Sequence, residues 1–113
     1  MATEADLRAI AVSLPGAEEQ PSYGKRPSWK VDGKGFVGIW KDDASAVFLA
    51  EDAAEKEALL TTEPDKFFTT AHYGTSARLL VRLEAIEPGQ LRELVTESWR
   101  QVAPPHLIDR LRQ

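Results

Sequence analysis

Trp29-Lys30-Val31-Asp32-Gly33-Lys34-Gly35-Phe36 is the stretch that decides the fold. Its central pair, Asp32-Gly33, favours a type I′ turn, in which both residues take positive φ and the twist matches that of two paired strands. The cross-strand pairs that follow from such a turn are Val31 with Lys34, Lys30 with Gly35, and Trp29 with Phe36. Trp29 and Phe36 are then expected to pack inward, and Lys30 to point the other way. The stretch therefore predicts a β-hairpin.

Helices are predicted toward both ends of the chain. Thr3 is expected to cap the first, with Asp6 at its third position completing a capping box, and Pro15-Gly16 to end it. Pro88 opens the last long helix and Pro104-Pro105 breaks it. Apolar and small residues recur at helical spacing in both segments: Leu7, Ile10, Ala11 and Leu14 in the first, and Leu91, Leu94, Val95, Ser98, Trp99 and Val102 in the last.

The elements between these helices are shorter. After a polar connector that reaches Pro27, the hairpin's second strand is expected to run to Trp40, with a turn at Asp42-Asp43. The remaining expectations are a strand over 46–49, a helix from Glu51-Asp52 with Ala54, Ala58, Leu59 and Leu60 as its apolar residues, a turn ending in Phe67-Phe68, and a strand over 79–83. This order favours an α+β fold with an antiparallel sheet, because a parallel sheet needs a crossover after nearly every strand.

Composition bounds the possible functions. The chain has 113 residues, which is one domain's length, and residues 1–113 are expected to form a single domain. It has no cysteine, which excludes disulfides, thiolate catalysis and zinc ribbons and is compatible with a cytoplasmic location. Neither a signal peptide nor a membrane-spanning segment is visible, so no membrane partner is expected.

A basic stretch stands out in this acidic chain. The net charge is −4, whereas residues 25–41 hold five cations and one carboxylate. Local potential governs how a polyanion docks, so Lys25, Arg26, Lys30 and Lys34 are candidates for contacts with nucleic-acid phosphates. The alternative is a hairpin whose lysines keep it in solution and protect an edge strand from pairing.

A second candidate site lies in the segment from Phe67 to Arg78. Three of its residues, His72, Tyr73 and Arg78, offer polar groups next to aromatic side chains, a combination that suits a small-molecule pocket. The alternative is a loop held in place by core aromatics. Residues 51–65, with six acids and one lysine, are expected to form a solvated face rather than a cation site.

Enzymatic chemistry finds little support. His72 and His106 lie in different elements, so no metal site is expected, and no cofactor is indicated. Ser76 is the one nucleophile near His72, and its spacing matches no known nucleophile elbow. Gly33-Lys34-Gly35 lacks the spacer and the following helix of a phosphate loop. The sequence therefore predicts a protein that is not an enzyme.

A set of short motifs carries a family resemblance across nearly the whole chain. They are Leu14-Pro15-Gly16, Tyr23-Gly24, Pro27 to Val31, Gly33 to Phe36, Glu57 to Leu60, Phe67 to Thr70, His72-Tyr73, Leu80 to Leu83, Leu91 to Leu94 and Trp99 to Pro104. Together they resemble the MmcQ/YjbR family. The resemblance implies a CyaY-like (frataxin-like) α+β fold, with the N- and C-terminal helices packed on one face of the sheet and hairpins described as a double wing.

The same resemblance implies a DNA-binding role, which rests on an analogy of shape. An iron-handling role, suggested by the frataxin-like fold, would need an acidic ridge, and Glu4, Asp6, Glu18 and Glu19 are too few and too scattered to form it. The expectation is a cytoplasmic, non-catalytic accessory protein, a monomer or weak homodimer, that contacts duplex DNA weakly and without sequence preference. The alternative partner is an unidentified small molecule near His72 and Tyr73.

Overall fold

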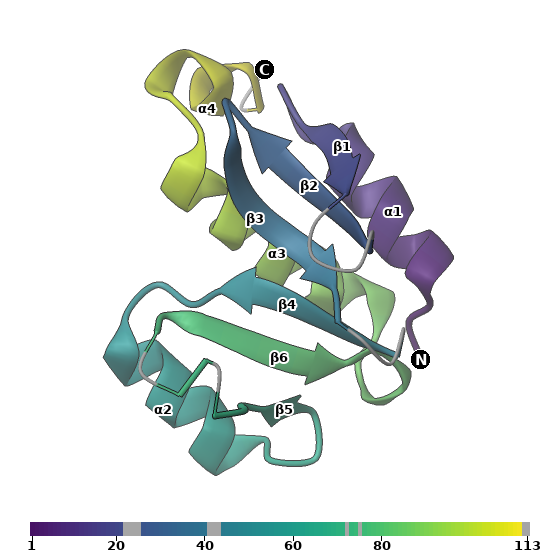
Figure 1. Ribbon diagram of the computed structural model, residues 1–113, viewed down its shortest axis with the longest axis vertical. Coiled ribbons are helices and arrows are strands. Elements are labelled where there is room, and N and C mark those ends of the chain that lie inside the picture. Colours follow the sequence, from purple (N-terminus) through teal and green to yellow (C-terminus); the bar gives the residue numbers. More distant parts are fainter. Residues whose placement is uncertain (22–25, 41–43, 72, 75, 112–113) are drawn as a thin grey trace.

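The computed structural model describes residues 1–21, 26–40, 44–71, 73–74 and 76–111, which form one antiparallel sheet and four α-helices (Figure 1). In chain order the elements are α1 (Glu4–Ser13), β1 (Glu18–Pro21), β2 (Pro27–Val31), β3 (Lys34–Ile39), β4 (Ser45–Leu49), α2 (Ala53–Thr62), β5 (Phe67–Phe68), β6 (Arg78–Arg82), a 3₁₀ turn (Leu83–Ala85), α3 (Pro88–Val102) and α4 (Pro105–Leu111).

The sheet has the strand order β1-β2-β3-β4-β6-β5, and every neighbouring pair is antiparallel. Helix α3 packs on β3 and β4 and also against α1, so both helices lie on one side of the sheet, behind it in Figure 1. Helix α2 lies at the edge of the sheet formed by β5. The expected antiparallel α+β fold is confirmed.

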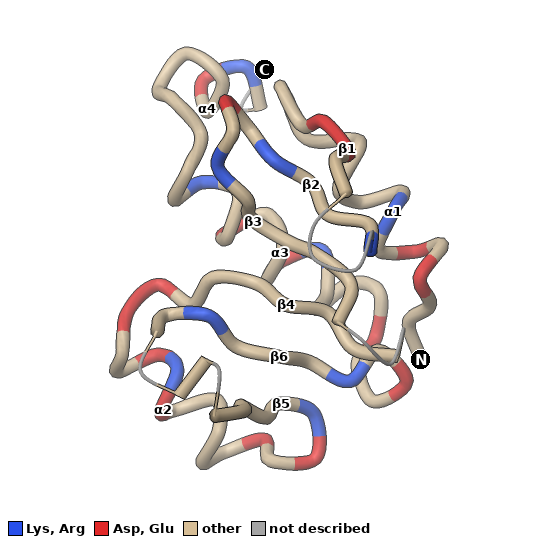
Figure 2. Tube along the Cα trace, in the orientation of Figure 1, with Lys and Arg blue, Asp and Glu red and all other residues tan. Residues whose placement is uncertain are grey.

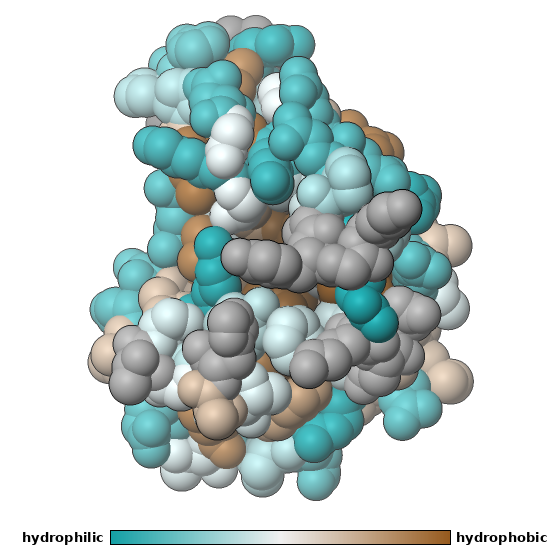
Figure 3. Space-filling model, in the orientation of Figure 1, coloured by the Kyte–Doolittle hydropathy of each residue, from teal (hydrophilic) through white to brown (hydrophobic). Residues whose placement is uncertain are grey.

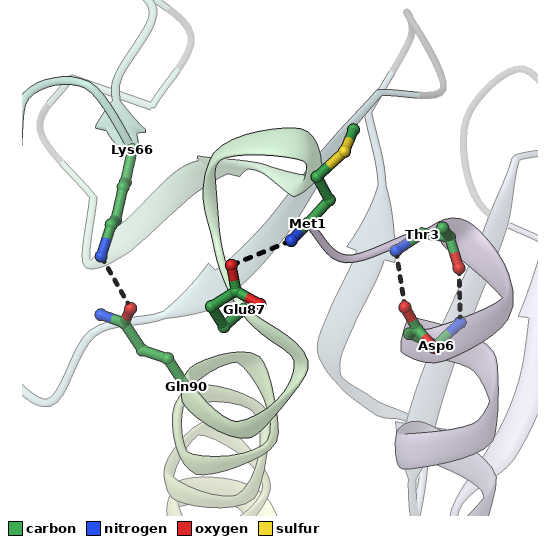
Figure 4. A network of polar contacts seen from close by, with 6 residues as sticks. All are labelled: Met1, Thr3, Asp6, Lys66, Glu87 and Gln90. Atoms are coloured by element: carbon green, nitrogen blue, oxygen red, sulfur yellow. Dashed lines mark hydrogen bonds and ion pairs between the residues drawn. The ribbon is translucent and has the colours of Figure 1, made fainter.

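The predicted start of α1 is also confirmed. The Thr3 hydroxyl accepts a hydrogen bond from the Asp6 backbone N–H at 3.1 Å, and the Asp6 carboxylate accepts one from the Thr3 N–H at 2.9 Å (Figure 4). Leu7, Ile10 and Ala11 are buried, as the spacing indicates. The reciprocal bonds satisfy two backbone donors that a helix start otherwise leaves to water.

The hairpin forms the predicted turn, with φ of 51° at Asp32 and 79° at Gly33. Lys30 pairs with Gly35, as expected. The predicted pairing of Trp29 with Phe36 is wrong: Trp29 pairs with Val37, because a β-bulge shifts the register between Trp29 and Lys30. One extra residue in β3 interrupts its alternation, so that two consecutive side chains can both be buried, and both Phe36 and Val37 are.

Two strands lie where the sequence predicts only connector or turn. Strand β1 lies in the stretch read as a polar connector, and β5 consists of Phe67 and Phe68. In β1, the Gln20 carbonyl accepts a 2.6 Å hydrogen bond from the Ser28 hydroxyl. Both strands are short and carry no periodic signal of their own, since each depends on pairing with a neighbour. The predicted turn at 42–43 lies outside the described residues.

Helix α2 begins as predicted and buries a different face. The Asp52 side chain caps it by accepting from the Glu55 N–H at 2.8 Å. The predicted apolar residues Ala54 and Ala58 are exposed, whereas Lys56 is buried with 6% of its surface accessible. The expected apolar stripe is therefore wrong at Ala54 and Ala58, whereas Leu59 and Leu60 are partly buried.

The start of α3 forms hydrogen bonds with segments that are distant in the sequence. Glu87 accepts from the Met1 amino group at 3.0 Å, and Gln90 accepts from the Lys66 ammonium at 3.0 Å (Figure 4). Further along α3, the Trp99 indole N–H donates to the Pro15 carbonyl at 2.9 Å. Among the described residues, no helix has the length and apolar character that crossing a membrane requires.

Candidate functional site

The side of the sheet that faces away from α1 and α3 is called the open face here. Side chains alternate between the two sides of a strand, and residues paired across strands share a side. Because Trp29, Val37, Phe48 and Val81 belong to the core, the alternate positions form the open face. These positions are Glu18, Gln20, Ser28, Lys30, Gly35, Gly38, Ser45, Val47, Leu49, Phe68, Arg78, Leu80 and Arg82.

The open face carries more positive than negative charge. Its strand residues include three cations, Lys30, Arg78 and Arg82, and one carboxylate, Glu18. Figure 2 shows the Lys and Arg positions on β2, β3 and β6, and many of the Asp and Glu positions along α2 and around β5. The chain is acidic overall, so this distribution separates a basic surface from an acidic remainder.

The four cations predicted to contact phosphates do not all lie together. Lys30 and Lys34 flank the hairpin turn, while Arg26 precedes β2 at its far end. Lys34 is exposed and pairs with Val31, a core residue, so it leaves the ribbon on the side opposite Lys30. Lys25 lies outside the described residues.

Strand β1 brings a carboxylate to the hairpin. Glu18 pairs with Lys30 across the β1–β2 ladder, which places their Cβ atoms about 5 Å apart. Its neighbour Glu19 forms an ion pair with Arg8, which also lies 5.5 Å from the centre of the Trp29 ring. The acidic strand therefore reduces the positive potential of the hairpin on its β1 side.

The segment between β5 and β6 is held in place by a buried cation. The Lys56 ammonium donates to the carbonyls of Tyr73 at 2.6 Å and of Ser76 at 2.7 Å. Burying an ammonium group is costly unless such acceptors compensate it, so these contacts fix the turn at 73–76 against α2. The sequence offered one signal: Lys56 lies three and four positions before Leu59 and Leu60, on the face that α2 turns inward.

This fixed turn presents an aromatic pair. The Tyr73 and Trp40 rings lie 5.1 Å apart, edge to face, and both residues are partly exposed. Trp40 follows the buried Ile39, and its backbone N–H donates to the Ser45 carbonyl at 2.8 Å, so the strand alternation places Trp40 on the open face. Of the predicted small-molecule residues, Arg78 lies on this face as well, and His72 lies outside the described residues.

Arg82 has a structural role. Its guanidinium lies 4.5 Å from the centre of the Phe68 ring and donates to the carbonyls of Pro64 and Asp65 at 3.3 and 3.4 Å. By contrast, across residues 1–21, 26–40, 44–71, 73–74 and 76–111, none of Lys30, Lys34 and Arg78 forms an ion pair. These three cations are available to an anion from outside.

A pocket of about 180 Å³ lies on the helical side of the molecule, between α1 and the start of α3. Its lining includes Asp6 and Arg92, and the Asp6 carboxylate is already engaged by the Thr3 N–H. Within the described part of the chain, no three His, Asp or Glu side chains group closely enough to hold a metal ion. The open face therefore remains the main candidate surface.

Comparisons with known proteins give one family model and several relatives. The YjbR family model matches residues 12–101. The chain is 32% identical to the uncharacterized proteins Rv2570 of Mycobacterium tuberculosis and Mb2600 of Mycobacterium bovis, over 96% of this chain and 94% of each relative.

A solved structure has the same fold. The crystal structure of the Deinococcus radiodurans protein DR2400, described as a DUF419 domain, superposes with a TM-score of 0.78 at 21% identity, covering 94% of this chain and 82% of that one. The family match spans all six strands of the sheet, α2 and nearly all of α3. The chain therefore belongs to the YjbR family.

Proposed function

We propose that this protein binds nucleic acid through phosphate contacts made by the β2–β3 hairpin, and that it is not an enzyme. The observation that carries the proposal is the pair of lysines flanking the hairpin turn: Lys34 is exposed, and Lys30 lies over Gly35, which has no side chain to restrict it. The type I′ turn between them fixes both strands of the ribbon, so the two ammonium groups are held at one end of the sheet.

The charge distribution predicts weak binding. Glu18 opposite Lys30 and the acids around α2 oppose a polyanion, so affinity should appear at low ionic strength and fall steeply with salt. Phosphate contacts carry no sequence information, and little sequence preference is expected. The frataxin-like description of the fold, the double wing and a cytoplasmic location belong to the same proposal.

Fluorescence anisotropy with a labelled duplex, titrated with salt from about 50 mM, tests the proposal. Replacing Lys30 and Lys34 together by Ala should flatten the log–log salt slope by about 2, roughly one for each phosphate contact. The matched control removes two cations elsewhere, Lys66 and Arg92, and should leave most of that slope in place. Equal slopes for the two double variants, or no binding by the parent at 50 mM salt, would contradict the proposal.

A small-molecule ligand is the second candidate, favoured by one observation. Lys56 is buried to hold the turn that carries Tyr73, and a fixed turn of this kind is typical of a preorganised binding site. The ligand would lie beside Tyr73 and Arg78. Lys56→Met should then abolish its binding, a result that the hairpin proposal does not predict.

A further inference from the structure

The open face contains one continuous line of residues across all six strands. Cross-strand pairing places them in the order Gln20, Ser28, Gly38, Val47, Leu80 and Phe68. The next line, toward the hairpin turn, holds Glu18, Lys30 and Gly35 on one side and Leu49 and Arg78 on the other. Ser28, Val47 and Leu80 in the first line are buried, whereas Lys30, Gly35, Leu49 and Arg78 in the second are partly exposed. The second line is therefore the more accessible of the two.

Strand β3 contributes only backbone to the middle of these two lines. A Cβ at Gly35 would meet nothing closer than the Lys30 Cγ at 4.0 Å, and one at Gly38 would meet the Ser28 Cβ at 3.2 Å. Figure 3, which views this face, shows near-neutral and apolar residues in a depression between the hairpin and the segments below it. Gly35 and Gly38 present no side chain of their own, so a flat group can approach the β3 backbone at these two positions as far as the described residues are concerned.

The β3 backbone at Gly35 and Gly38 is called the bare strip, and aromatic rings and cations lie around it. Trp40 directly follows β3, two positions after Gly38, and its ring contacts that of Tyr73, whose carbonyl is bound by Lys56. Lys30 and Arg78 lie on β2 and β6, three strand spacings or about 14 Å apart. The face thus combines partly exposed aromatic rings with two cations that, within the described residues, have no ion-pair partner.

We propose that the open face binds single-stranded nucleic acid, with bases lying against the Trp40–Tyr73 pair and the β3 glycines, and phosphates near Lys30 and Arg78. This inference rests on the proposed nucleic-acid function and specifies that the bound nucleic acid is single-stranded. Bases of a single strand are free to stack on aromatic side chains, whereas a duplex hides them and offers mainly its phosphates. Two separated cations beside a broad, shallow face match a polymer with regularly spaced charges better than a compact ligand.

The experiment compares a labelled 12-residue oligothymidylate with a 12-base-pair duplex by anisotropy on the full chain at about 50 mM salt. The single strand should bind at least five-fold more tightly, the effect expected for one stacked base. Arg78→Gln should weaken single-strand binding, whereas Arg92→Gln, which removes an exposed cation from α3 on the opposite side, should not.

Gly35→Thr is the sharper variant. It keeps every charge, suits a β-strand and has room at its Cβ, yet it places a side chain on the bare strip. Single-strand binding should fall at least five-fold and by more than duplex binding, which the Thr side chain affects only through its contact with Lys30. Tyr73→Phe, which keeps the ring, should bind the single strand like the parent, and Tyr73→Ala should not. An unchanged circular dichroism spectrum and melting temperature establish that each variant is folded.

The outcomes separate this inference from the proposed function. Duplex binding that depends on Lys30 and Lys34, with no preference for single strands, overturns the inference and leaves the proposed function standing. Competition by thymidine monophosphate as effective as that by the oligonucleotide also overturns it, in favour of a small ligand. No binding to either nucleic acid overturns both.

Discussion

The Ser98 hydroxyl donates to the carbonyl oxygen of Phe36 at 2.5 Å, which joins the middle of α3 to the bulge in β3. The Ser98 hydroxyl oxygen also accepts from the Leu49 backbone N–H at 2.9 Å, at the end of β4. One buried side chain thus satisfies two backbone groups that the sheet ladder leaves unpaired. Ser98 is fully buried, so no water replaces it easily.

Ser98→Ala should lower the free energy of unfolding by about 1–3 kcal/mol, because it leaves a buried carbonyl and a buried N–H without partners. Chemical denaturation measures this loss. Ser13→Ala, at an exposed position of α1, is the matched control and should change stability by no more than about 0.5 kcal/mol. Equal effects of the two substitutions would show that the Ser98 bridge contributes nothing.

Trp29→Ala should cost about 3–5 kcal/mol, because the indole is fully buried beneath α1 and its removal leaves a large cavity. For a domain of this size that is a large fraction of the total stability. Urea denaturation followed by far-ultraviolet circular dichroism measures it. A loss below about 1 kcal/mol would mean that the site collapses around the missing ring.

Gly33→Ala should destabilise the hairpin by about 1–2 kcal/mol, because φ at Gly33 is 79° and an L side chain there is strained. Space is not the cause, since a Cβ at Gly33 would meet nothing within 4 Å. Gly89 has the same free space in the first turn of α3, so Gly89→Ala should be neutral or stabilise by up to about 1 kcal/mol. Thermal unfolding of both variants should therefore give shifts of opposite sign, or a shift for Gly33 alone.

Lys56→Met should lower stability by about 1–3 kcal/mol and change the environment of Tyr73, because two carbonyls lose the ammonium group that satisfies them. Lys66→Met is the control: its ammonium forms a partly exposed ion pair with Glu63 at 2.9 Å, worth at most about 1 kcal/mol. Denaturation and near-ultraviolet circular dichroism measure the two effects. Identical near-ultraviolet spectra for Lys56→Met and the parent would contradict a role in fixing the turn.

Local sequence signals predicted the elements that are stabilised by their own residues. The α1 capping box, the Asp32-Gly33 turn and the face of α3 each follow from spacing within a few positions. The errors concern features decided by partners distant in the chain. Strand β1 exists because β2 pairs with it, and the bulge at Phe36 forms where Ser98, 62 positions away, binds the backbone.

The candidate site likewise has features that local sequence predicted and features that it did not. The lysines of the hairpin were visible as a local excess of charge, and Tyr73 and Arg78 as polar residues among aromatics. That Arg78 shares a face with Lys30 depends on the register of four strands, and Glu18 becomes a neighbour of Lys30 only through β1. Neither relationship has a signature within a short window of sequence.

The contact of Lys56 with the turn at 73–76 also governs how the molecule opens locally. Native proteins exchange amide hydrogens through partial unfolding of cooperative units, and a bond that joins two segments makes them open together. Helix α2 and the Tyr73 turn should therefore behave as one such unit, distinct from the helices behind the sheet. Each opening of α2 would withdraw Tyr73 from Trp40, so the lifetime of the aromatic pair is set by a helix that lies outside the sheet.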